Sequence, residues 1–82
     1  MRENARYKII KSISLPSCEF VLGEKETASG TKYVTWRCVR LKDYYYGHYT
    51  ESLITATRDL YERAKEEIEF ILNNMEVNNN EN

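Results

Sequence analysis

The chain has 82 residues, of which 41% are hydrophobic and 30% charged, and its net charge is -1 at pH 7. This length allows a single domain, and the composition is typical of a folded globular chain rather than a disordered one. No apolar run reaches the roughly eighteen residues that a transmembrane helix needs, and no signal-peptide core follows the N-terminus. We therefore expect a cytoplasmic protein that does not bind membranes.

Four short segments alternate between apolar and polar residues, which predicts β-strands at residues 6–15, 18–24, 32–41 and 44–49. Residues 23–31 are small, charged or glycine and predict a loop. The predicted fold is α+β: an antiparallel meander of three or four strands with one long C-terminal helix packed on one face.

The helix is predicted from residue 50 to about residue 75, with Thr50 as its N-cap. Its apolar stripe needs a sheet to cover, so the folded domain should span residues 6–75. Residues 1–5 and the Asn-rich residues 76–82 are predicted to be disordered. The stripe consists of Leu53, Thr57, Leu60, Ala64, Ile68, Ile71 and Met75.

The apolar residues of the third predicted strand indicate which side of the sheet the helix should cover. Trp36 is its largest apolar residue, so we predict that the Trp36 side faces the helix and that the opposite side is open. The predicted core is Leu60, Ala64, Ile68, Trp36, Val34, Phe20, Leu22, Ile9 and Ile13.

The open side of the sheet and the tyrosine-rich segment before the helix are the candidate contact surface. Exposed tyrosines are favoured at protein interfaces, so we predict a small non-enzymatic interaction protein that binds a protein partner or itself as a homodimer. The predicted surface consists of Tyr33, Thr35, Arg37, Val39, Lys8, Tyr45 and His48.

Aromatic and basic side chains on a sheet also bind single-stranded nucleic acid, which makes a nucleic-acid-binding module the alternative prediction. Glu19 on the same predicted face weighs against it, as does the slightly negative net charge. The residues that would serve this alternative are Tyr33, Arg37, Arg40 and Lys8.

Catalysis and metal binding have little support in the sequence. His48 is the only histidine, and the two cysteines, Cys18 and Cys38, are far apart in the chain and form no CxxC motif. We expect His48 to serve a structural or hydrogen-bonding role and the cysteines to be reduced thiols packed in the core. The prediction is a protein that is not an enzyme and holds no cofactor or metal.

Three short motifs resemble a family of small bacterial proteins of unknown function from plasmids, phages and conjugative elements. They follow the pattern FVxGE, YVTWxC and YYxGHY within residues 18–65. The resemblance implies a bacterial cytoplasmic setting and an accessory role on mobile DNA. It implies no activity, cofactor or catalytic residue.

Overall fold

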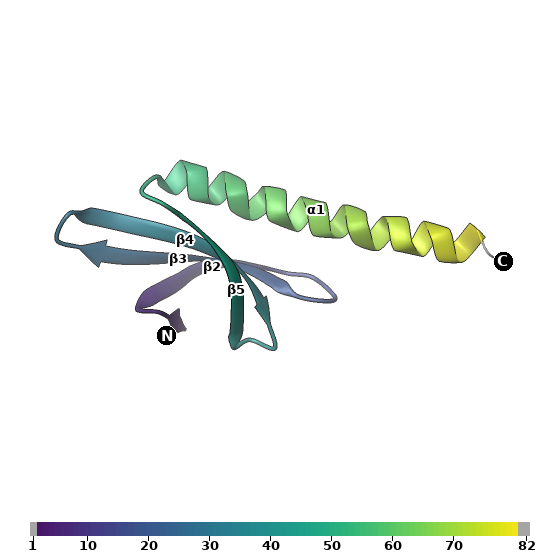
Figure 1. The fold of residues 1–82 in the computed structure, drawn as a ribbon, viewed down its shortest axis with the longest axis horizontal. Coiled ribbons are helices and arrows are strands. Elements are labelled where there is room, and N and C mark those ends of the chain that lie inside the picture. The colour runs from purple at the N-terminus through teal and green to yellow at the C-terminus, as the bar shows by residue number, and fades with distance from the viewer. Residues whose placement is uncertain (1, 81–82) are drawn as a thin grey trace.

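Five antiparallel strands and one C-terminal helix make up the fold, and the strands are neighbours in the order of the sequence (Figure 1). The structure is a computed structural model that describes residues 2–80, with side chains described through residue 75. The α+β class and the antiparallel meander are confirmed, but the sheet has five strands, not three or four. The elements are β1 (Glu3–Asn4), β2 (Tyr7–Ser14), β3 (Glu19–Thr27), β4 (Gly30–Val39), β5 (Asp43–Thr50) and α1 (Leu53–Asn80).

The additional strand lies at the N-terminus. β1 pairs with the beginning of β2, and the amide of Ile9 donates a hydrogen bond of 2.9 Å to the carbonyl oxygen of Arg2. The predicted disorder of residues 1–5 is therefore wrong for residues 2–5, and Met1 lies outside the described residues. Residues 2–5 contain no apolar side chain larger than that of Ala5, so their hydrophobic pattern does not indicate a strand.

β3 and β4 form a long hairpin that runs through part of the predicted loop at residues 23–31. The turn is stabilised by Thr27, whose hydroxyl accepts a hydrogen bond from the amide of Ser29 and donates one to the carbonyl oxygen of Gly30. Gly30 has a φ of 118°, a conformation that side chains disfavour. Residues 23–27 therefore continue β3 up to this turn instead of forming the predicted loop.

α1 begins after Ser52, which is its N-cap in place of the predicted Thr50. The amide of Thr55 donates a hydrogen bond of 3.1 Å to the hydroxyl of Ser52. Thr50 instead ends β5 and accepts a hydrogen bond from the amide of Ser52. The helix continues to Asn80, beyond its predicted end near residue 75, and residues 81–82 of the predicted tail lie outside the described residues.

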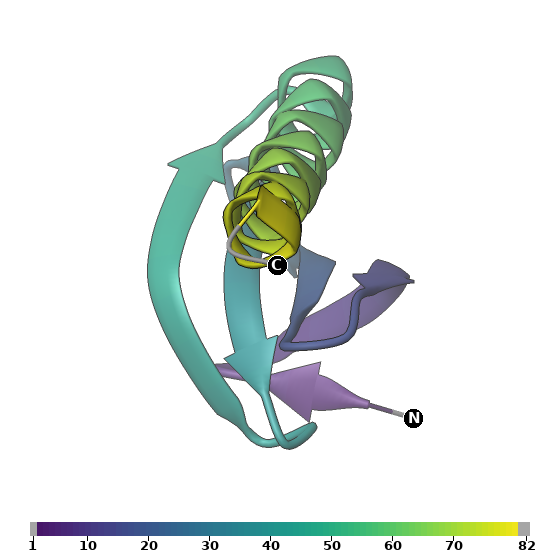
Figure 2. The same ribbon diagram turned by 90° about the vertical axis from the view of Figure 1, so that its right-hand side faces the viewer.

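α1 covers one face of a strongly twisted and curled sheet (Figure 2). Its side chains pack against Phe20 and Leu22 of β3 and against Cys18 just before that strand. The helix side of this cluster is formed by Ala56, Leu60 and Ala64.

The opposite face of the sheet carries a second buried cluster, and it contains Trp36. The indole is only 4% exposed and packs edge-on against the rings of Tyr7 and Tyr44, at centroid distances of 5.7 and 5.5 Å. The prediction that the Trp36 side faces the helix is therefore wrong. The cluster consists of Tyr7, Val21, Val34, Trp36 and Cys38.

Strand register explains this error. In an antiparallel sheet, directly paired residues project to the same face. Phe20 is paired with Arg37, so Arg37 shares the helix face, whereas Trp36 is paired with Val21 on the other face. The core of β3 was assigned to the correct face, and that of β4 to the wrong one.

A β-bulge divides the predicted core residues of β2 between the two faces. Ile9 pairs with Gly23 but Lys11 pairs with Leu22, so Ile10 is an extra residue in the strand. Ile9 therefore packs in the Trp36 cluster, whereas Ile13 packs beneath the helix. The bulge also places Lys11 on the helix side, where its ammonium lies 5.9 Å from the centre of the Tyr61 ring.

The C-terminal part of α1 extends past the sheet, which gives the molecule dimensions of 58 × 23 × 16 Å (Figure 1). Ile68 is 41% exposed, so its prediction as a core residue is wrong. Within the described residues no helix combines the length and apolar character that crossing a membrane requires.

Candidate functional site

The predicted contact surface on β4 lies beneath α1 and is not open. Thr35 is fully buried and donates a hydrogen bond to the carboxylate of Asp59, and Arg37 forms an ion pair with Glu67. Tyr33 and Val39, which the prediction also placed on the open face, pack against the helix-side cluster.

The remaining predicted residues stay accessible but do not form one surface. Lys8 is exposed on β2, whereas Tyr45 and His48 are exposed on β5, with β3 and β4 between them. Arg40, proposed for nucleic-acid binding, forms an exposed ion pair of 3.1 Å with Asp43. The structure therefore separates the residues that either predicted function would have combined.

His48 links β5 to the helix. Its Nδ1 lies 2.8 Å from the Oδ2 of Asp59, the same oxygen that accepts the hydrogen bond from Thr35. A shallow cavity of about 220 Å³ lies beside this pair. Among the described residues no group of three His, Cys, Asp or Glu side chains could hold a metal ion. The contacts of His48 are those of a residue that fixes the position of α1.

The N-terminus covers part of the face opposite the helix. The guanidinium of Arg2 donates two hydrogen bonds, of 2.8 and 2.6 Å, to the buried carboxylate of Glu19 and one to the hydroxyl of Tyr44. These Arg2 hydrogen bonds hold the pKa of Glu19 below its ordinary value. Arg2 therefore covers the part of the Trp36 cluster that lies beside Glu19 and Tyr44.

The two cysteines lie on opposite faces of the sheet, Cys18 beneath the helix and Cys38 in the Trp36 cluster. Both are buried free thiols, and burial raises the pKa of each. A raised pKa reduces the fraction of reactive thiolate at neutral pH. Both cysteines therefore act as packed core residues, as the sequence indicated.

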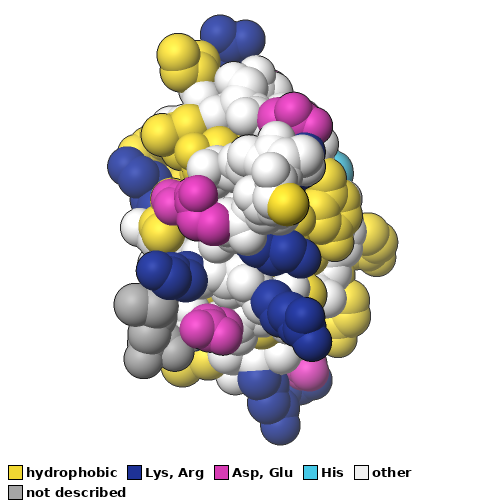
Figure 3. All heavy atoms as spheres, turned by 90° about the vertical axis from the view of Figure 1, so that its left-hand side faces the viewer, with side chains coloured by type: hydrophobic (Ala, Val, Ile, Leu, Met, Phe, Trp, Pro, Cys, Tyr) yellow, Lys and Arg dark blue, Asp and Glu magenta, His cyan; other side chains and the backbone are white. Residues whose placement is uncertain are grey.

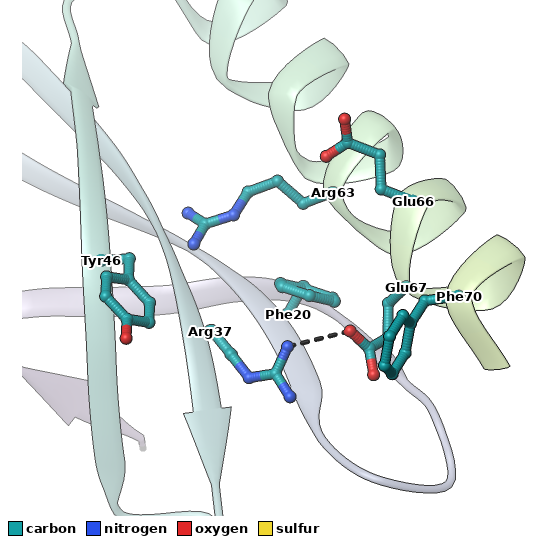
Figure 4. Close-up of a pocket in the computed structure, with 7 residues that line it drawn as sticks. All are labelled: Phe20, Arg37, Tyr46, Arg63, Glu66, Glu67 and Phe70. Atoms are coloured by element: carbon teal, nitrogen blue, oxygen red, sulfur yellow. Dashed lines mark hydrogen bonds and ion pairs between the residues drawn. The ribbon is translucent and has the colours of Figure 1, made fainter. Parts of the chain in front are cut away.

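A groove of about 610 Å³ lies between the sheet and the middle of α1. Figure 4 shows side chains from both elements converging on it, with the phenyl ring of Phe20 at its base. We call this feature the α1–β5 groove. It is lined by Phe20, Arg37, Tyr46, Arg63, Glu66, Glu67 and Phe70.

The two arginines of the groove have different partners. Arg37 pairs with Glu67 at 2.9 Å, and Glu67 also accepts a hydrogen bond of 2.8 Å from the hydroxyl of Ser17. The Ser17 hydrogen bond, followed by that of Arg37, lowers the pKa of Glu67. This carboxylate is therefore ionised at neutral pH and compensates the charge of Arg37.

Arg63 has no such carboxylate. Its Nη1 donates hydrogen bonds of 3.1 Å to the carbonyl oxygen and the hydroxyl of Thr35, and within residues 2–75 no acidic side chain forms an ion pair with it. Partial burial lowers its pKa, although the group stays charged at neutral pH. Its guanidinium carbon lies 5.5 Å from the centre of the Phe20 ring. Asp59 and Glu66 attract the charge of Arg63 without contacting it directly, so the groove contains a partly buried cation that forms no direct ion pair with a carboxylate within residues 2–75.

Two exposed aromatic rings flank the groove, Tyr46 at 75% exposure and Phe70 at 60%. Tyr46 has a φ of 54° at a bulge where the pairing of β4 with β5 shifts register between Thr35 and Arg37. The next residue must be small, because a Cβ atom on Gly47 would lie 2.9 Å from the indole nitrogen of Trp36. Gly47 therefore lets the Trp36 indole pack directly against the backbone next to Tyr46.

The sequence prediction included Arg37 and the tyrosine-rich segment that contains Tyr46, but it missed Arg63 and Phe70. Phe70 was the available signal, because it is an aromatic residue outside the apolar stripe of the predicted helix. Arg63 precedes it by seven residues and therefore projects from the same side of α1. No protein-family model, curated protein or solved structure matches the chain, so the groove has to be interpreted from its own chemistry.

Proposed function

We propose that this chain is a non-enzymatic interaction protein that binds a protein partner in the α1–β5 groove. The carrying observation is the combination of Arg63, which hydrogen-bonds Thr35 but forms no direct ion pair with a carboxylate within residues 2–75, with the two exposed rings of Tyr46 and Phe70. This proposal keeps the tyrosine-rich segment as a contact surface and replaces the sheet face with the groove. The mobile-element setting suggested by the sequence motifs stays a prediction.

The aromatic rings supply the apolar part of the interaction. Tyr46 and Phe70 hold large rings at the surface, where each exposes area that a partner can remove from water. Tyrosine and arginine are enriched among the residues that contribute most to protein interfaces. An apolar side chain of the partner would insert between the two rings, above Phe20.

Arg63 supplies the polar selectivity. A carboxylate that enters the groove can form a charge-assisted hydrogen bond with the guanidinium, which stabilises a partly desolvated ion. Glu66 and Glu67 line the same groove and disfavour a second negative charge. The expected partner segment therefore carries one Asp or Glu beside an aromatic or aliphatic residue.

Selection from a random peptide display library tests this directly. The enriched peptides should share an acidic residue next to an apolar one, and a synthetic consensus peptide should bind at least about tenfold more weakly to Arg63→Gln and to Tyr46→Ala, since hot-spot truncations cost about 2 kcal/mol. Arg58→Gln, an exposed arginine of the same helix, is the matched control and should bind normally. Equal binding to wild type and both groove variants would refute the proposal.

Nucleic-acid binding is the alternative, since aromatic and arginine side chains also contact single strands. The acidic residues of the groove weigh against it, as does the charge distribution on the end shown in Figure 3, where basic and acidic side chains are interspersed. Fluorescence anisotropy with a labelled single-stranded oligonucleotide should show no binding at about 50 mM salt. Tight binding that weakens steeply by about 200 mM salt would favour the alternative instead.

A further inference from the structure

A second surface, on the other side of α1, is apolar and exposed. It has one apolar residue every seven positions, and Leu72 lies between the last two of them. A seven-residue repeat keeps side chains on one side of a helix and is the spacing that pairs two helices in a coiled coil. We call these residues the α1 stripe: Ile54, Tyr61, Ile68, Leu72 and Met75.

The stripe is separate from the α1–β5 groove. Tyr61 of the stripe contacts Lys11 of β2, whereas Arg63 and Asp59 on the other side of the helix contact Thr35 and His48 of β4 and β5. Because β2 and β5 lie on opposite sides of the five-stranded sheet, the stripe and the groove project from opposite sides of α1. An inference about the stripe is consequently independent of the function proposed for the groove.

The charges beside the stripe favour a second copy of α1 in antiparallel orientation as its occupant. Arg58 and Lys65 each follow a stripe residue by four positions and therefore lie on the same side of α1. In a parallel pair, Arg58 would face Arg58 of the second copy and Lys65 would face Lys65, and these like charges repel. In an antiparallel pair that places Lys65 opposite Ile68 of the second copy, Lys65 lies next to Glu69 of that copy. The same register places Leu72 opposite Tyr61.

The size of the stripe sets the strength of this association. At about 1.5 Å rise per residue, the distance from Ile54 to Met75 is about 32 Å, or three heptads. A strip of this length and of helix width, about 10 Å, buries well below the roughly 800 Å² per partner of a standard stable interface. The dimer should therefore be weak and depend on protein concentration.

We infer that the chain forms a weak antiparallel homodimer through the α1 stripe. Sedimentation equilibrium of the full chain between about 10 μM and about 1 mM should give a mass that rises from 9.8 kDa towards twice that value. Ile68→Glu combined with Leu72→Glu should remain at the single-chain mass, because both side chains are exposed in the monomer and their replacement introduces charge into the seam. A wild-type chain that stays monomeric throughout this range would overturn the inference.

Phe70→Glu is the matched control, since Phe70 is an exposed apolar residue of the same helical region that lies in the groove and not in the stripe. It should dimerise like wild type while losing the peptide binding proposed above. The stripe variant should do the reverse, so the two proposals fail separately. Loss of dimer in Phe70→Glu equal to that in the stripe variant would contradict this assignment.

Cross-linking tests the orientation. Mild oxidation of the double variant Arg58→Cys, Met75→Cys should produce a disulfide-linked dimer, because the antiparallel register brings these positions together. Each single variant should stay uncross-linked, as should wild type, whose Cys18 and Cys38 are buried. Efficient cross-linking of either single variant would indicate a parallel pair and overturn the antiparallel assignment.

Discussion

Glu19 is almost fully buried on the sheet face opposite the helix, and Arg2 is the reason it can remain charged there. A buried carboxylate without a partner is strongly disfavoured, whereas a bidentate guanidinium supplies both charge and hydrogen bonds. The two bonds of 2.8 and 2.6 Å come from a residue near the N-terminus that the sequence pattern assigned to a disordered segment. One polar contact thus fixes the N-terminus, covers part of the Trp36 cluster and lowers the pKa of Glu19.

This pair predicts how stability depends on pH. Because the folded-state pKa of Glu19 lies below the unfolded value of about 4.3, its contribution is present above that value and is lost as the pH falls through the folded pKa. Glu19→Gln should therefore unfold more easily than wild type at pH 7, and the difference should shrink towards about pH 2. Urea titrations at several pH values measure this.

Glu62→Gln, on the exposed side of α1, is the control for this experiment and should change stability little at any of these pH values. A Glu19→Gln variant whose deficit stays constant from pH 7 to the acid limit would mean that Arg2 does not hold the carboxylate in its ionised form.

At the scale of the elements, β4 shows how far the sequence determines the fold. Its alternation correctly indicates a strand, and the long amphipathic segment correctly indicates a helix packed on a sheet. Both faces of β4 are buried, however, so the alternation does not tell which face meets the helix. That choice depends on the pairing of Val21 with Trp36 and on the bulges at Ile10 and Tyr46, which are properties of the assembled sheet.

The candidate site was less predictable than the fold for the same reason. Arg37 was identified, but on the assumption that its face was open. Tyr46, Arg63 and Phe70 come together only because α1 passes over that face, and the spacing of residues within one strand contains no information about a helix some thirty positions later.

The turn between β4 and β5 is strained, which leads to a prediction about stability. Arg40 and Leu41 have φ values of 58° and 64°, and the amide of Lys42 donates a hydrogen bond to the carbonyl oxygen of Val39. This is the geometry of a type I′ turn, which favours Asn-Gly. Arg40→Asn with Leu41→Gly should stabilise the fold by about 1 kcal/mol, because the relief of strain exceeds the entropic cost of glycine and the loss of an exposed ion pair.

A urea midpoint that rises with an unchanged m value would support this expectation. Gly30→Ala provides the opposite control, since its φ of 118° should make any side chain destabilising. If the Asn-Gly variant instead unfolded at lower urea than wild type, the left-handed conformation of this turn would be wrong.

At the scale of the whole molecule, the two faces of the sheet have different roles. One face holds the Trp36 cluster under the Arg2–Glu19 pair, and the other holds α1 through Thr35, Arg37 and the helix-side core. α1 packs on the sheet as a single helix through Ala56, Leu60 and Ala64, so its two flanks remain exposed (Figure 1). The α1–β5 groove occupies one side and the α1 stripe the other.

Both proposed surfaces depend on the side of the sheet that α1 covers, and the contacts of the Trp36 indole report that side. A nuclear Overhauser spectrum of the folded chain should show cross-peaks from the Trp36 ring to the rings of Tyr7 and Tyr44, which lie 5.7 and 5.5 Å away between centroids, and none to the methyl groups of Leu60 or Ala64. Cross-peaks between Trp36 and Leu60 would place the indole beneath the helix and contradict the account.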